Sequence, residues 1–153
     1  MRITTRTRYA IRALYDLAFH RLGQAAGAKE IADRQKVPLR FLEQILQDLR
    51  KAGIVEARRG PRGGYALARP PAQITLAEVL YAVRGPLEEM FGFDAPANGN
   101  GTGNGDDVPA AVWTDVRARL VDVLARATLQ DFVTRAEAAG VKRAALPATM
   151  YFI

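Results

Sequence analysis

The residue types best suited to chemistry lie in one short stretch, RRGPRGGYAL, which covers residues 58–67. A glycine-rich loop with basic side chains can hold phosphate groups, either for catalysis or as a hairpin tip on a nucleic-acid backbone. A phosphate loop of the Walker type needs Gly-Lys followed by Ser or Thr, and then a helix. Here the glycines lead into Tyr65 and a strand-like alternation. The stretch therefore predicts a basic hairpin, although glycines are also ordinary turn residues in hairpins that bind nothing.

Basic side chains gather around this predicted hairpin. Residues 50–69 contain six Arg and Lys residues against a single acidic one, Glu56. Arg62 falls at the predicted tip, and Gly63 and Gly64 would let the backbone approach a ligand closely. Such a tip can enter the minor groove of DNA or hold phosphates. We predict DNA contacts by Arg8 in the first helix and, around the hairpin, by Arg50, Arg58, Arg59, Arg62, Gly63, Gly64 and Tyr65.

The hairpin must be positioned by helices, and the sequence predicts three of them before it, over residues 5–21, 28–35 and 39–53. The third has the most regular apolar spacing, with Leu42, Ile45, Leu46 and Leu49 on one face. Pro38 suits the first position of this helix, and Gly53 suits its C-terminal cap. The face opposite the leucines is polar.

This polar face carries the three side-chain types that read base edges in the major groove. Arg donates to guanine, Gln pairs with adenine, and Glu accepts from N4 of cytosine. Arg40, Glu43 and Gln44 supply these types, with Pro38 at the start of the helix. A solvated helix surface would have the same composition, so the face gains meaning only beside the basic hairpin. Together they predict a winged helix-turn-helix that binds duplex DNA.

The rest of the chain predicts a helical appendage. A helix over residues 74–85 opens with Thr75 and Glu78 at capping-box spacing. Residues 86–110 are rich in Gly and Asn and predict a flexible loop. Residues 111–140 predict two helices, of which the first has a nearly heptad-spaced apolar stripe suited either to pairing two chains or to an ordinary core. The stripe consists of Trp113, Val116, Leu120, Val123, Leu124 and Ala127.

The expected fold class is thus mainly α with a small β-hairpin. A winged helix-turn-helix DNA-binding domain would cover residues 1–85, and a long C-terminal dimerisation helix would follow the loop. Residues 141–153 would form a C-terminal tail that ends in large apolar side chains.

Composition narrows the function further. Residues 1–84 hold 16 Lys and Arg against 7 Asp and Glu, whereas residues 85–153 hold 6 against 9, so the basic half suits a polyanion. The chain has no cysteine, which excludes disulfides, thiolate catalysis and cysteine-held metals or clusters. With one histidine and no metal-ligand pattern, we predict a regulator rather than an enzyme, with no cofactor or metal. Charges interrupt the apolar N-terminal residues, so we expect a cytoplasmic protein with no membrane partner.

Four stretches resemble the IscR/NsrR/CymR family of bacterial winged helix-turn-helix regulators: RYAIRALYDLA, EIADRQKVPLRFLEQILQDLRKAGIV, RGPRGGYAL and ITLAEVLYAVRGPL. The resemblance implies a homodimer that binds palindromic promoter DNA. It assigns the recognition helix to Pro38, Arg40, Glu43 and Gln44, and the wing to Arg59 and residues 63–65. Many members hold a cluster through cysteines in the loop after the fourth helix, and the corresponding loop here has none.

The second half resembles the family's cysteine-metabolism repressors, through WTDVRARLVDVLARATLQDF and the terminal MYFI. That branch lacks a cluster and responds through a complex with the cysteine synthase O-acetylserine sulfhydrylase. The resemblance implies that Met150, Tyr151, Phe152 and Ile153 enter the active-site cleft of that enzyme. Three alternatives stay open: a tail that folds onto its own dimer, a regulator that senses another effector, and an interaction subunit of the synthase with little DNA specificity.

Overall fold

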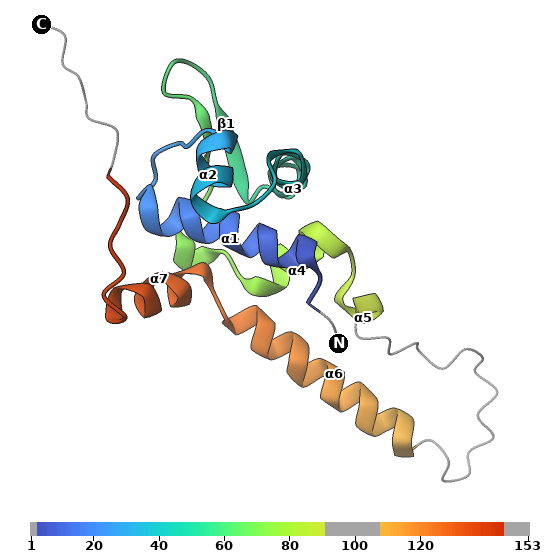
Figure 1. Cartoon of the computed structure of the whole chain (residues 1–153). Coiled ribbons are helices and arrows are strands. Elements are labelled where there is room, and N and C mark those ends of the chain that lie inside the picture. The colour runs from blue at the N-terminus through green and yellow to red at the C-terminus, as the bar shows by residue number, and fades with distance from the viewer. Residues whose placement is uncertain (1–2, 91–107, 146–153) are drawn as a thin grey trace, which may run out of the picture.

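The structure is a computed structural model that describes residues 3–90 and 108–145 (Figure 1). Its elements are α1 (Thr5–His20), α2 (Ala28–Gln35), α3 (Leu39–Lys51), β1 (Val55–Arg58), β2 (Gly64–Leu67), the 3-10 turn η1 (Pro71–Gln73), α4 (Leu76–Arg84), α5 (Leu87–Met90), α6 (Val108–Arg126) and α7 (Leu129–Ala138). The two strands pair antiparallel, with Val55 opposite Leu67 and Arg58 opposite Gly64. The predicted class, mainly α with one small hairpin, is confirmed.

One hydrophobic core joins the N-terminal elements. The face of α3 predicted from its spacing is confirmed, because Leu42, Ile45, Leu46 and Leu49 are all fully buried. They pack with Leu14 of α1 and with residues of α2 and α4. Each such side chain contributes roughly 1.5–3 kcal/mol through its burial. This core holds α3 in place while its opposite face stays in solvent.

Helix α7 packs into the N-terminal unit instead of standing apart with α6. Leu129 lies in the main core, and Val133 and Ala136 pack against Ala18 and Phe19 at the end of α1. The α6–α7 junction is also tied to the start of α4, where the Leu76 amide donates to the Ala127 carbonyl at 2.8 Å. The expected dimerisation segment 111–140 therefore divides into two parts with different roles, and only α6 extends away from the core (Figure 1).

The predicted loop over residues 86–110 is shorter than expected at both ends. Its first residues form the short helix α5, in which Leu87 is buried, and α6 already begins at Val108. The remaining residues of that prediction, 91–107, lie outside the described part of the chain. The chain is helical at residues 87–90, where Leu87 is buried. The composition of the segment does not predict this burial.

The first helix differs from its predicted pattern at two positions. The apolar spacing that starts at Tyr9 predicts Leu22 on the apolar face, but α1 ends at His20 and Leu22 is exposed, with a φ of +49°. The same spacing predicts Asp16 on the solvent side with Arg8 and Arg12, but Asp16 is fully buried. Pro38 likewise precedes the first turn of α3 as its N-cap, where its φ of −60° and ψ of 127° are extended.

Candidate nucleic-acid interface

The outer face of α3 presents the side chains that the sequence assigned to base contacts. Arg40, Glu43 and Gln44 are all exposed, and Pro38 is exposed at the N-cap. Figure 1 shows α3 and the hairpin on the same side of α1, with α7 on the other side. The geometry therefore leaves the helix face and the hairpin accessible together, as a groove-binding helix with a wing requires.

The first turn of α3 carries two large apolar side chains that the sequence analysis did not assign to the interface. Leu39 and Phe41 are exposed rather than buried. The sequence gives little indication of their exposure, because Leu42, Ile45, Leu46 and Leu49 already form a complete apolar face without them. Exposed apolar groups beside Arg40 and Gln44 are of the kind that contact the methyl group of thymine.

The hairpin is fixed to α3 and to the segment that precedes α2. Gln47 donates from Nε2 to the Tyr65 hydroxyl over 3.0 Å, which links α3 to β2. The backbones of Ala26 and Tyr65 exchange two hydrogen bonds of 2.8 and 2.9 Å, so residue 26 acts as a one-residue third strand. Tyr65 is half-buried, and its hydroxyl accepts this exposed hydrogen bond from Gln47, so its predicted contact with DNA stays a prediction.

Contacts within the chain explain why residues 63 and 64 of the wing are glycines. A Cβ at Gly63 would lie 2.3 Å from the Arg58 carbonyl oxygen, and one at Gly64 would lie 2.3 Å from the Ala26 carbonyl oxygen. Gly64 also has a φ of +139°, a backbone conformation that residues with a side chain rarely adopt. The sequence predicts that both glycines contact DNA. The structure shows that the closure of the hairpin requires Gly63 and that the pairing with Ala26 requires Gly64.

Replacing Gly64 by Ala should lower the free energy of unfolding by about 2 kcal/mol or more, because it adds backbone strain and a clash with another backbone. Chemical denaturation of the purified variant measures this. Gly60→Ala is the matched control, since Gly60 also has positive φ but no atom lies within 4 Å of its added Cβ. A loss in G64A no larger than in G60A would contradict the Ala26 contact.

The hairpin arginines fall into two groups. Arg59 and Arg62 are exposed in the turn between the strands, and within the described residues neither has an ion-pair or hydrogen-bond partner. Arg58 is bound to Glu56 at 2.9 Å and to the Gly23 carbonyl oxygen at 3.0 Å. Arg58 therefore braces the turn end of the two strands against the Gly23 backbone, while the turn arginines are available to phosphates. The other two predicted contacts, Arg8 on α1 and Arg50 in the last turn of α3, are exposed.

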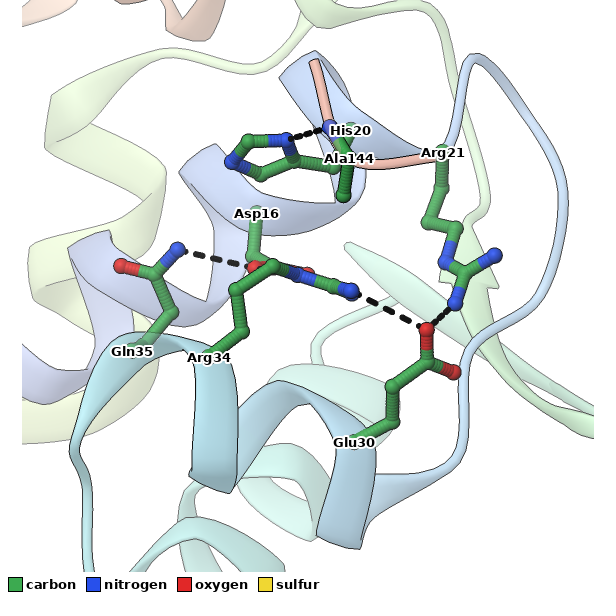
Figure 2. Close-up of polar contacts among 7 residues, drawn as sticks. All are labelled: Asp16, His20, Arg21, Glu30, Arg34, Gln35 and Ala144. Atoms are coloured by element: carbon green, nitrogen blue, oxygen red, sulfur yellow. Dashed lines mark hydrogen bonds and ion pairs between the residues drawn. The ribbon is translucent and has the colours of Figure 1, made fainter. Parts of the chain in front are cut away.

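A polar network around the buried Asp16, which the sequence did not predict, joins α1 to α2 (Figure 2). Arg34 binds the Asp16 carboxylate in bidentate fashion, with Nε to Oδ2 at 2.6 Å and Nη2 to Oδ1 at 2.8 Å. Gln35 donates to the same carboxylate at 2.8 Å. The hydrogen-bonded carboxylate raises the pKa of Arg34, so the guanidinium stays charged. α2 leads into α3 through a three-residue turn, so this network lies one turn away from the start of α3.

The same network reaches the end of α1 through Glu30. Its carboxylate pairs with Arg34 at 3.0 Å and with Arg21, whose side chain is only 2% exposed (Figure 2). Burial lowers the pKa of Arg21, and the neighbouring charge of Arg34 lowers it further.

His20 ties the residues after α7 to the end of α1. Its Nδ1 accepts the backbone N–H of Ala144 at 2.9 Å, and its side chain is buried (Figure 2). Burial lowers the pKa of His20, which favours the neutral imidazole that can accept this bond. Arg143 adds a second tie, because its guanidinium lies 4.5 Å from the centre of the Phe19 ring.

Comparisons with known proteins agree with this geometry. Residues 3–135 match the family Rrf2, described as "Iron-dependent Transcriptional regulator". A protein of Synechocystis sp. is 40% identical over 132 residues, with 86% of each chain covered, and its name includes the words HTH-type transcriptional regulator.

The chain belongs to the Rrf2 family.

Solved structures of Rrf2 relatives share the fold. CymR, the global cysteine regulator of B. subtilis, gives a TM-score of 0.68 at 30% identity, covering 88% of this chain and 98% of its own. IscR of T. potens gives a TM-score of 0.72 at 31% identity, covering 94% of each chain. The resemblance to this group of winged helix-turn-helix regulators is confirmed, and this Rrf2 protein is a transcriptional regulator rather than an enzyme.

The residues of this Rrf2 protein do not fit a cysteine-held iron site. The chain contains no cysteine, and the Nδ1 of its single histidine, His20, already accepts a hydrogen bond from Ala144. Across residues 3–90 and 108–145, no three Asp, Glu or His side chains are grouped so that they could hold a metal ion. The same described residues contain no helix that is long and apolar enough to cross a membrane.

Proposed function

We propose that this Rrf2 protein is a dimeric repressor of cysteine and sulfur metabolism genes, controlled by a complex with O-acetylserine sulfhydrylase. The observation that carries the DNA-binding part is the joint exposure of the polar α3 face and the two turn arginines. α3 would lie in the major groove, and Arg59 and Arg62 would contact phosphates or the minor groove beside it.

Helix α6 supports the proposal of a homodimer. It is 19 residues long, and its apolar stripe is incompletely covered by this chain, since Trp113 is 54% and Val123 is 62% exposed. The other four stripe residues, Val116, Leu120, Leu124 and Ala127, are half-buried. A second copy of α6 would cover the stripe and place two recognition helices about 34 Å apart, one turn of DNA. In that case the dimerisation helix is α6 alone, and α7 braces it against the core.

Replacing Val123 by Asp should weaken the dimer by about a hundredfold or more, because a carboxylate would lose its water in an apolar interface. Sedimentation equilibrium measures the dimer dissociation constant. Ala125→Asp is the control, since Ala125 is exposed on α6 but lies off the stripe. Equal dimer dissociation constants for wild type and V123D would refute the pairing through this stripe.

The sulfur assignment is supported by the sequence of the tail and by the missing cysteines. Identity to CymR, at 30%, and to IscR, at 31%, does not separate the two branches. The absence of cysteine favours a cluster-free regulator. Tyr151, Phe152 and Ile153 offer three large apolar side chains in a row, which the cleft of a partner enzyme can capture. These residues lie outside the described part of the chain.

Regulation in this proposal is a competition for one cleft. When O-acetylserine is scarce, the tail occupies the synthase cleft, and the complex favours the DNA-bound dimer. When O-acetylserine accumulates, it displaces the tail and repression is relieved. The direction follows from linkage, because a ligand that excludes the tail must weaken any state that needs the tail bound.

Deleting residues 150–153 should abolish binding of the synthase and leave operator affinity of the free regulator unchanged within about twofold. Co-purification from the native lysate and isothermal titration with purified synthase measure the first effect, and a gel-shift titration measures the second. Undiminished co-purification of the synthase would refute the tail assignment. The operator readout tells this failure apart from loss of DNA binding.

Two alternative functions have separate signatures. A cluster-free regulator of another effector would bind its operator and ignore the synthase. An interaction subunit of the synthase would bind the enzyme, yet keep the same weak DNA affinity after the α3 face is changed. The double substitution of Arg40 and Gln44 described in the Discussion distinguishes these cases.

A further inference from the structure

A cleft of about 540 Å³ lies between the base of the wing and α7. Its walls come from three parts of the chain that are distant in sequence: the end of α1, the residues from β2 to η1, and α7 with the residues after it. Arg58 of β1 completes the rim. The volume falls within the range of small-molecule sites, which is about 300–1,000 Å³. None of the residues assigned to base contacts on α3 lines this cleft.

Three arginines line the cleft, and each is held in place by the chain itself. Arg58 is fixed by Glu56 and the Gly23 carbonyl, and Arg69 by Glu78 and the Gln73 carbonyl, all at 2.9–3.0 Å. Arg143 is held by Glu137, the Phe19 carbonyl and the Phe19 ring. A guanidinium has five N–H groups, so each one keeps donors that bind nothing within the described residues. Fixed donors lose little entropy when they bind a ligand.

The remaining walls define what such donors could bind. The apolar lining consists of Ala18, Leu22, Leu67, Pro70, Pro71 and Val133. Each of the three arginines is paired with one carboxylate, from Glu56, Glu78 or Glu137, so the cleft offers free guanidinium donors without a large excess of positive charge. Free N–H donors favour a singly charged acceptor such as a carboxylate over a multiply charged phosphate ester, and the apolar walls favour an aliphatic body. The matching ligand is a small aliphatic monocarboxylate.

We propose that this cleft is an effector site for a small aliphatic carboxylate. The site touches both the wing, through Arg58, and α7, which leads back to the proposed dimerisation helix. A carboxylate bound to the free donors of Arg58 holds the turn end of the hairpin, through the Arg58–Gly23 tie, in an orientation that weakens operator binding. The effect on DNA rests on the proposed function, whereas the binding of the carboxylate does not.

The test is a titration of the full-length ¹⁵N-labelled protein with 4-methylpentanoate, followed by amide chemical shifts. We expect saturable shifts at Gly23, Ala68 and Val133, and at least fivefold weaker binding of the neutral 4-methylpentanamide. Arg143→Gln should weaken the binding of 4-methylpentanoate at least fivefold. Arg69→Gln is an independent second variant for which we expect the same loss. Arg135→Gln removes the same charge from α7 outside the cleft and should change binding less than twofold.

Absence of saturable shifts, equal binding of the amide, or full binding by both R143Q and R69Q would each overturn the site. Saturating 4-methylpentanoate should also weaken the operator affinity of wild type at least threefold, and R143Q should need at least fivefold more of it for the same effect. If the probe binds but the protein shows no operator binding at all, the proposed function fails and the cleft assignment survives. If operator binding is intact and the probe does not bind, only the cleft assignment fails.

Discussion

Replacing Asp16 by Asn should lower the free energy of unfolding by about 3–5 kcal/mol. This is the largest loss of stability that we expect from a substitution that exchanges one side-chain oxygen for nitrogen. The substitution keeps the size of the side chain and removes its charge. Arg34, which is mostly buried, would then lack its counter-ion, and one of its N–H groups would face an amide N–H instead of an oxygen. Removing one partner of a buried pair costs more than the intact pair contributes, because the remaining charge stays buried.

Urea denaturation followed by circular dichroism measures this loss. Asp33→Asn is the matched control on α2, since Asp33 is exposed and, among the residues that the structure describes, pairs only with the exposed Lys29 at 2.8 Å. Exposed pairs of this kind contribute less than about 1 kcal/mol. If D16N were as stable as D33N, the network in Figure 2 would not hold α2 on α1.

The largest effect on DNA binding should come from Arg40→Ala combined with Gln44→Ala. Each bidentate base contact discriminates by about 1–3 kcal/mol, so the double variant should lose roughly 2–6 kcal/mol of operator affinity, or thirtyfold and more. Non-specific affinity should change far less, because it comes mainly from phosphate contacts such as those proposed for Arg59 and Arg62. The specificity ratio should therefore fall nearly as much as the operator affinity.

Fluorescence anisotropy with an operator selected from genomic DNA, and with a scrambled duplex of equal length, measures both affinities at one fixed salt concentration. Arg126→Ala provides the control, because it removes an exposed arginine from α6, where Arg126 pairs with Asp122 at 3.0 Å. Its operator affinity should stay within about twofold of wild type. An unchanged ratio of operator to scrambled binding in the double variant would refute base reading by this face.

Local patterns predicted the elements that carry the interface. The apolar spacing of α3 gave its buried face and, by subtraction, its exposed one. The Thr75 capping box was visible three residues apart, and it closes in the structure with hydrogen bonds of 2.9 and 3.2 Å. Strand alternation and the glycine turn predicted the hairpin in the stretch where β1 and β2 lie. Each of these signals lies within a single element, which is why the sequence alone contains it.

Features that depend on distant partners could not be predicted in the same way. Asp16 looks like a solvent-side residue until Arg34 and Gln35 arrive from another helix. The apolar residues of α7 could equally have faced a second chain, and only the core shows that they pack on α1. Gly64 looked like a DNA-contact glycine, whereas its lack of a Cβ serves the Ala26 backbone. In each case the deciding contact spans many residues and leaves no local periodicity.

Hydroxyl-radical footprinting of the wild-type protein on its operator tests the central claim most directly. We expect two equivalent protected regions related by two-fold symmetry, with centres about one helical turn, or 10 base pairs, apart. V123D, at concentrations where it is monomeric, should lose this paired pattern. A single unpaired region of protection in the wild-type footprint, or a paired footprint that persists in the Arg40 and Gln44 double variant, would contradict the account.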